Sequence, residues 1–236
     1  MADRIAACPD RGSELCPARP SERHTAVVGL AQQFGHPSGL LGALVGRGMA
    51  RGNAALSRWV VEQVAARQGH DIKRVAELGP GPGVGLEALL AEFPDAHVWA
   101  ADLSSVMLSQ SRKRNQAAVT AGRLTLVEGG VSALSPSEPA DIVMANHVLY
   151  FWQEPVAEMA QIRGFLRPGG LLALGYQLEQ HMPAMAQRRF PRAGHQLYAA
   201  DDQVAALANA AGFGSVTHDV KGPDEAPEGR VMLATA

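Results

Sequence analysis

Short apolar runs alternate with longer amphipathic stretches from residue 53 to the C-terminus. This alternation predicts strands separated by helices, the order of an α/β chain with a parallel sheet. The predicted strands cover residues 75–78, 96–101, 124–127, 141–145 and 171–176, with two more at 215–220 and 230–235. The predicted helices cover residues 53–68, 84–93, 104–120, 155–166 and 204–211, and residues 179–195 are expected to be irregular. One domain is the simplest organisation for this pattern.

The first 52 residues do not follow this alternation. Residues 1–25 are polar and contain prolines, so they predict a flexible tail. Residues 26–52 mix small apolar runs with glycines, which weaken a helix by ~1 kcal/mol each relative to alanine. This segment predicts cap helices, either packed permanently on the sheet or forming a mobile lid. Asn53 is the expected N-cap of the helix that follows.

Residues 74–85 read Arg-Val-Ala-Glu-Leu-Gly-Pro-Gly-Pro-Gly-Val-Gly and carry the strongest functional signal. A short buried strand leads directly into four glycines at alternate positions, and an apolar helix follows at once. Such a turn presents backbone N–H groups and a helix N-terminus to a ligand. The segment therefore predicts a site for a nucleotide-like cofactor.

The spacing of these glycines separates two classes of cofactor. The dinucleotide fingerprint needs G-x-G-x-x-G, or alanine at its last position, directly after the strand. The registers starting at Gly79 and Gly81 lack the third glycine. Only the register from Gly83 fits, ending at Ala88, and it lies far beyond the end of the strand. An NAD-dependent oxidoreductase is therefore the weaker alternative.

Glu77 stands at the end of the buried strand, where a carboxylate costs free energy unless a cation or hydrogen-bond donor of the ligand satisfies it. The string Glu77-Leu78-Gly79-Pro80-Gly81-Pro82-Gly83 resembles the E-x-G-x-G-x-G signature of class I S-adenosylmethionine-dependent methyltransferases. This resemblance implies S-adenosyl-L-methionine as cofactor and a methyltransferase domain over residues 53–236. It implies that Glu77, Gly79, Gly81 and Gly83 lie in the cofactor site. The implied fold is a doubly wound, Rossmann-like α/β sheet of seven strands, with the last strand inserted antiparallel and cap helices before it.

The end of the second predicted strand carries Asp102, at the sheet edge where ligands bind in open parallel sheets. A carboxylate there suits the two hydroxyls of a ribose, while an N-cap for the next helix is the alternative role. The resemblance places Leu103 and Met107 near the adenine. Many relatives carry an aspartate for the adenine amino group where this chain has Gly130. A backbone contact from Val131, or the side chain of the nearby Glu128, is the expected substitute.

The fourth predicted strand runs into a second family-like segment, residues 146–155. The resemblance places Asn146 at the methionine end of the cofactor and His147 and Tyr150 near the transferred methyl group. His147 is the first candidate for a general base because its ordinary pKa suits proton transfer, and Tyr150 is the second. Phe151 and Trp152 are expected to pack against the following helix. Weaker candidates for the base are His36, His181 and His195.

Composition narrows the remaining choices. The chain has 236 residues, 47% of them hydrophobic, and a formal net charge of −2 without a basic run, which argues against a nucleic-acid partner. No apolar stretch is long enough for a membrane span and no signal core is visible, so a cytoplasmic protein is expected. Cys8 and Cys16 predict free thiols, and no metal site is expected. A homodimer is one assembly that the sequence leaves open.

The leading hypothesis is methyl transfer to a small-molecule acceptor. The shared motifs also occur in the quinone-type C-methyltransferase branch, so the acceptor atom (O, N or C) stays open. Besides the oxidoreductase, a catalytically silent S-adenosylmethionine-binding protein of the same fold is an alternative.

Overall fold

A computed structural model describes residues 39–134, 138–223 and 225–236, with side chains from residue 54 onward. Its centre is a seven-stranded sheet in the order β3-β2-β1-β4-β5-β7-β6. The strands are β1 (Arg74–Leu78), β2 (His97–Asp102), β3 (Leu124–Glu128), β4 (Ala140–Asn146), β5 (Leu166–Tyr176), β6 (Val216–Lys221) and β7 (Gly229–Thr235). β1 to β5 are parallel, and β7 lies antiparallel between β5 and β6. The expected doubly wound fold with an inserted antiparallel last strand is confirmed.

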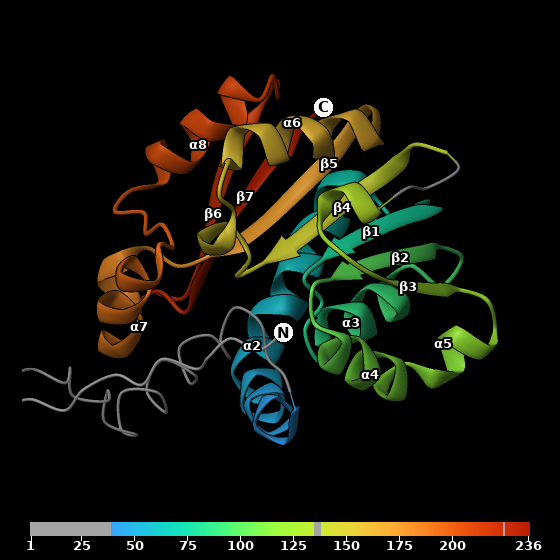
Figure 1. Ribbon diagram of the computed structural model, residues 1–236. Coiled ribbons are helices and arrows are strands. Elements are labelled where there is room, and N and C mark those ends of the chain that lie inside the picture. The colour runs from blue at the N-terminus through green and yellow to red at the C-terminus, as the bar shows by residue number, and fades with distance from the viewer. Residues whose placement is uncertain (1–38, 135–137, 224) are drawn as a thin grey trace, which may run out of the picture.

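Helices cover both faces of the sheet. They are α2 (Gly39–Gln68), α3 (Val84–Glu92), α4 (Ser105–Arg114), α5 (Gln116–Thr120), α6 (Pro155–Phe165), α7 (Ala184–Arg189) and α8 (Asp201–Ala210). In Figure 1, α6 and α8 lie on one face, whereas α2, α3 and α4 lie on the other. No helix in the described part of the chain is long and apolar enough to span a membrane.

The two faces bury separate apolar clusters, because neighbouring strand residues point to opposite sides of a sheet. On the α2 and α3 face, Val75, Ile142 and Met144 pack with Val60, Val64, Leu86 and Leu89. On the α6 and α8 face, Ala76, Val143 and Ala145 pack with Met159, Ile162 and Val204. These runs are apolar at successive positions because the parallel strands are covered on both sides.

The first described helix begins earlier than the sequence pattern predicts. α2 runs from Gly39 to Gln68, so Asn53 lies inside the helix and does not cap it. The glycines before Asn53 each weaken a helix, but the stretch contains no proline and is rich in alanine and leucine, which sustain helical backbone. The predicted tail at 1–25, residues 26–38 of the predicted cap, and Cys8, Cys16 and His36 lie outside the described residues.

Four other boundaries differ from the sequence prediction. The helix expected at 104–120 is two helices, because the backbone turns at Asn115. β5 begins at Leu166 and includes the Pro168-Gly169-Gly170 turn, which the prediction placed before the strand. Residues 179–195 contain α7 and short 3-10 turns. α8 begins at Asp201, whose carboxylate binds Tyr176 and Arg230 and does not cap the helix.

Candidate functional site

A cavity of about 450 Å³ opens at the carboxyl ends of β1, β2 and β4. This is the edge at which open parallel sheets bind ligands. Ten predicted site residues line it: Glu77, Gly79, Gly81, Asp102, Leu103, Met107, Gly130, Val131, Asn146 and His147. Two other predicted residues, Gly83 and Tyr150, are not part of its lining.

The glycine loop between β1 and α3 is held by contacts with the rest of the protein. The Gly79 N–H donates to the Ala101 carbonyl at 2.8 Å. A Cβ on Gly83 would approach Ser111 and Asn115 within 2.8 Å, so this glycine is required by packing. Gly81 has a φ of +52°, and a Cβ there would have no neighbour within 4 Å. Gly81 therefore presents bare backbone to the cavity.

Helix α4 clamps this loop, a role that the sequence analysis missed. The Ser111 hydroxyl donates to the Gly81 carbonyl at 2.8 Å, and the Asn115 amide donates to the Gly83 carbonyl at 3.0 Å. The Arg114 guanidinium donates to the Pro82 carbonyl at 2.9 Å. The sequence signal for this contact is that Ser111 and Asn115, on the inner side of α4, are polar where apolar residues would be expected.

Asp102 connects the glycine loop to the start of α4. One of its carboxylate oxygens accepts the Gly81 N–H at 3.0 Å, and the other accepts the Ser104 N–H at 2.8 Å. The N-cap of α4 is Ser104, whose hydroxyl accepts the Met107 N–H at 3.3 Å. Both contacts hold this carboxylate at the edge of the cavity, where ligand hydroxyls can approach it. Beside it Leu103, 53% exposed, forms an apolar part of the cavity wall.

Glu77 is an acid of the cavity with a strongly perturbed pKa. It is buried, and its Oε2 atom has no hydrogen-bond partner among the described residues. Burial, followed by the nearby charge of Asp102, raises the pKa of Glu77 to about 8. Gly85 is required next to it, because a Cβ there would overlap Glu77 Oε1. A buried acid of this kind favours a ligand that brings positive charge or hydrogen-bond donors.

Asn146 and His147 follow directly at the end of β4. Both amide atoms of Asn146 are buried and lack a hydrogen-bond partner among the described residues, an arrangement that is costly without a ligand. His147 adopts a φ of +58°, and its N–H donates to the Gly175 carbonyl at 2.8 Å. This strained backbone turns His147 into the cavity wall. Burial lowers the pKa of His147 to about 4, so its imidazole is neutral at pH 7.

Tyr150 lies behind this wall and not in it. Its hydroxyl donates to the Gln177 carbonyl at 3.1 Å and accepts the Gln177 N–H at 2.6 Å. Burial raises the pKa of this hydroxyl above its usual range. The structure thus brings His147 to the cavity but gives Tyr150 a contact that joins the β4 loop to the end of β5.

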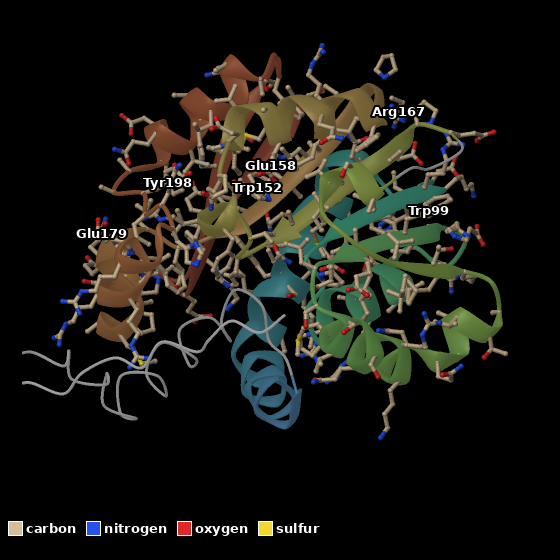
Figure 2. All side chains as sticks on the ribbon, viewed as in Figure 1. Trp99, Trp152, Glu158, Arg167, Glu179 and Tyr198 are labelled. Carbon is tan, nitrogen blue, oxygen red and sulfur yellow. The ribbon has the colours of Figure 1, made fainter. Side chains whose placement is uncertain are left out.

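Several cavity residues were not assigned to the site from the sequence: Ser57, Ser132, Phe151, Trp152, Gln153, Glu158 and Gln161. Phe151 and Trp152 were expected only to pack against the next helix, but they also line the cavity. Trp152 and Glu158 are labelled in Figure 2, at the start of α6. Polar positions beside the buried stripe of α6 could have indicated Glu158 and Gln161 as wall residues.

Comparisons with known proteins agree with this geometry. Residues 75–170 match the family described as a methyltransferase domain. Over 104 residues the chain is 35% identical to a trans-aconitate 2-methyltransferase of Rhodopseudomonas palustris (strain BisB18), covering 44% of this chain and 38% of that protein. The chain spans less than half the length of this and two other trans-aconitate 2-methyltransferases that it matches.

Solved structures share the fold at low sequence identity. An O-methyltransferase family protein from Burkholderia thailandensis superposes with a TM-score of 0.65 at 21% identity, over 81% of this chain and 58% of that chain. The N-methyltransferase NodS from Bradyrhizobium japonicum WM9, in complex with S-adenosyl-L-homocysteine, gives a TM-score of 0.58 at 16% identity, over 75% and 84% of the two chains. Together, the family match over residues 75–170, the sheet order and the glycine-loop cavity support a class I S-adenosylmethionine-dependent methyltransferase fold for this chain.

Proposed function

We propose that this chain transfers a methyl group from S-adenosylmethionine to a small-molecule acceptor. The observation that carries the proposal is the cavity at the strand ends, where unpartnered buried atoms of Glu77 and Asn146 lie beside the open backbone of Gly81. Such atoms call for a ligand that supplies several hydrogen-bond donors and acceptors at once.

The residues present fit this cofactor. Glu77 and Asn146 would hold the amino-acid end, because the cofactor's ammonium group satisfies an acid and its carboxylate satisfies an amide N–H. Asp102 would accept hydrogen bonds from the ribose hydroxyls. Leu103, Met107, Gly130 and Val131 would surround the adenine, and Gly83 would support the loop from behind. When bound, the cofactor's sulfonium supplies the methyl group for an in-line displacement.

The protein's own contribution is alignment and exclusion of water. Positioning alone can supply effective molarities of roughly 10⁵ to 10⁸ M. His147 is the cavity-wall group able to accept a proton from the acceptor, because it is neutral at pH 7. Its low pKa makes it a weak base, so it suits an acceptor that loses its proton during the attack. Tyr150 would position this wall through Gln177 and not react itself.

The charge of the cavity narrows the class of acceptor. Of the described residues that line it, Glu77, Asp102 and Glu158 are acidic and none is Lys or Arg. An anionic acceptor would need a cationic partner in this wall, and the described lining supplies none. We therefore infer a neutral or cationic acceptor for this chain, in contrast to the trans-aconitate named for its relatives. Transfer to O, N or C remains open.

The first test is parallel calorimetric titration with S-adenosylmethionine, S-adenosylhomocysteine and NAD. Micromolar binding of the first two alone is expected. Binding of NAD alone would favour the oxidoreductase alternative and refute the proposal. Turnover on a panel of neutral, cationic and anionic acceptors, with trans-aconitate among the anions, then separates an enzyme from a silent cofactor-binding protein.

The remaining expectations about the whole protein stay predictions. These are a cytoplasmic location, a possible homodimer, and no nucleic-acid or membrane partner.

A further inference from the structure

Glu158 is an acid of the cavity wall without a role in the assignments above. It lies in the first turns of α6, beside the buried residues Pro155 and Met159. The backbone N–H groups of Gln153 and Glu154 lie near enough to favour its charged form. A carboxylate has about four lone-pair sites, so this group can accept a hydrogen bond from a ligand in the cavity. Partial burial raises its pKa.

Among the described residues, Glu158 is the one acid that turn η1 and helix α6 contribute to the cavity lining. The short 3-10 turn η1 (Val131–Ala133) packs against α6, and both elements contribute to the lining, through Val131 and Ser132 on one side and Glu158 on the other. Gly130, just before this turn, has no side chain, and a Cβ there would meet no atom within 4 Å. Glu128, at the end of β3, is exposed and is not part of the lining.

The hydrogen-bond donor groups of the cofactor can be matched with the carboxylates of the cavity lining. S-adenosylmethionine carries three groups of hydrogen-bond donors: its ammonium, its ribose hydroxyls and its adenine amino group. The described residues of the lining supply three carboxylates, Glu77, Asp102 and Glu158. Glu77 lies one residue before the end of β1 and Asp102 ends β2, where they face the ammonium and the ribose in the proposed arrangement. In this matching, the carboxylate left over is that of Glu158, and the donor group left over is the adenine amino group.

We propose that the Glu158 carboxylate accepts a hydrogen bond from the exocyclic amino group of the cofactor's adenine. Glu158 then determines specificity for adenine over purines without this group, and it does so from α6 instead of from the end of β3. This inference rests on the proposed function of the site.

The test compares S-adenosylhomocysteine with its 6-deamino analogue, in which C6 of the purine carries hydrogen in place of the amino group. Calorimetry measures the dissociation constants of both for the unmodified protein, E158A, E158Q and the control E154A. Glu154 is the neighbouring exposed acid outside the cavity lining, so its loss should leave both affinities unchanged. The unmodified protein should prefer S-adenosylhomocysteine by about tenfold or more, as for a hydrogen bond to a charged acceptor.

In E158A the ratio of the two dissociation constants should fall toward one, because the variant loses affinity for S-adenosylhomocysteine and not for the 6-deamino analogue. E158Q should show an intermediate preference, since its amide keeps one uncharged acceptor oxygen, and it provides the measurement if E158A does not fold. A purely structural role at the start of α6 would weaken both ligands equally, and an unchanged preference in both variants would overturn the inference. Failure of the unmodified protein to bind S-adenosylhomocysteine would instead refute the proposed function itself.

Discussion

Replacing Glu77 with glutamine should remove a pH dependence from cofactor binding. The pKa of Glu77 is raised to about 8, so the unliganded protein holds this group almost entirely as the neutral acid at pH 6. Binding an ammonium group favours the carboxylate and therefore releases a proton. The affinity for S-adenosylhomocysteine should then rise with pH by up to about tenfold per pH unit between pH 6 and 8. In E77Q the group stays neutral, and the affinity should be low and nearly independent of pH over this range.

The assay is calorimetric titration at pH 6, 7 and 8 in two buffers of different ionisation enthalpy, which also counts the protons released. The control is E62Q, which removes an exposed acid of α2 outside the cavity and should behave as the unmodified protein. An equal pH dependence in E77Q and the unmodified protein would refute the role of Glu77. So would binding without proton release at pH 6.

The same group makes a separate prediction for the unliganded protein. The folded-state pKa of Glu77 lies above its ordinary value of 4.5, so the stability that it contributes is complete below pH 4.5 and is lost as the pH rises toward about 8. The melting temperature should therefore decline across this window, and E77Q should show a shallower decline. A steeper decline in E77Q would contradict the pKa assignment.

Three further predictions concern the loop and its neighbours. G81A and G122A impose similar strain, because both glycines have a positive φ and no atom near the added Cβ. Only G81A should weaken S-adenosylhomocysteine binding, by tenfold or more in calorimetry, because of the two only Gly81 lines the cavity. Equal affinities of the two variants would contradict the assigned loop. S111A should lower the affinity about fivefold without touching the ligand, since the Gly81 carbonyl loses its donor; unchanged binding would show that the loop keeps its shape alone. The imidazole of His147 should titrate near pH 4 by NMR, and H147A should reduce turnover by roughly 10² to 10⁴ with little change in cofactor affinity if it is the base; full activity would exclude that role.

The sequence predicted the parts of the fold that depend on local patterns. Short, continuously apolar runs identified β1 and β4 as strands covered on both faces. The glycine loop and Asp102 were predicted to lie in the ligand site because ligands bind where such strands end. The clamp from Ser111 and Asn115 could not be predicted in this way, because it joins residues about 30 positions apart through backbone carbonyls. Such contacts leave no periodic signal along the chain.

The position of Tyr150 illustrates a second limit. A motif near the end of a strand suggests that all its polar residues face the site, yet a 3-10 turn, η2 (Leu149–Phe151), rotates successive side chains in different directions. His147 reaches the cavity through its positive φ, whereas Tyr150 points back to Gln177. Side-chain direction within a turn depends on backbone angles that residue types specify weakly.

The glycine motif has two physical functions, and the structure separates them. Gly79, Gly83 and Gly85 are small because Val148, Ser111 and Glu77 occupy the space beside them, whereas the space that a Cβ on Gly81 would fill is open. Contacts with Ala101, Asp102, Ser111 and Asn115 therefore hold the loop in shape before any ligand arrives. Because an ordered loop loses little conformational entropy on binding, most of the interaction with the ligand is available as affinity. Residues that never touch the cofactor, Ser111 foremost, thereby contribute to how tightly it binds.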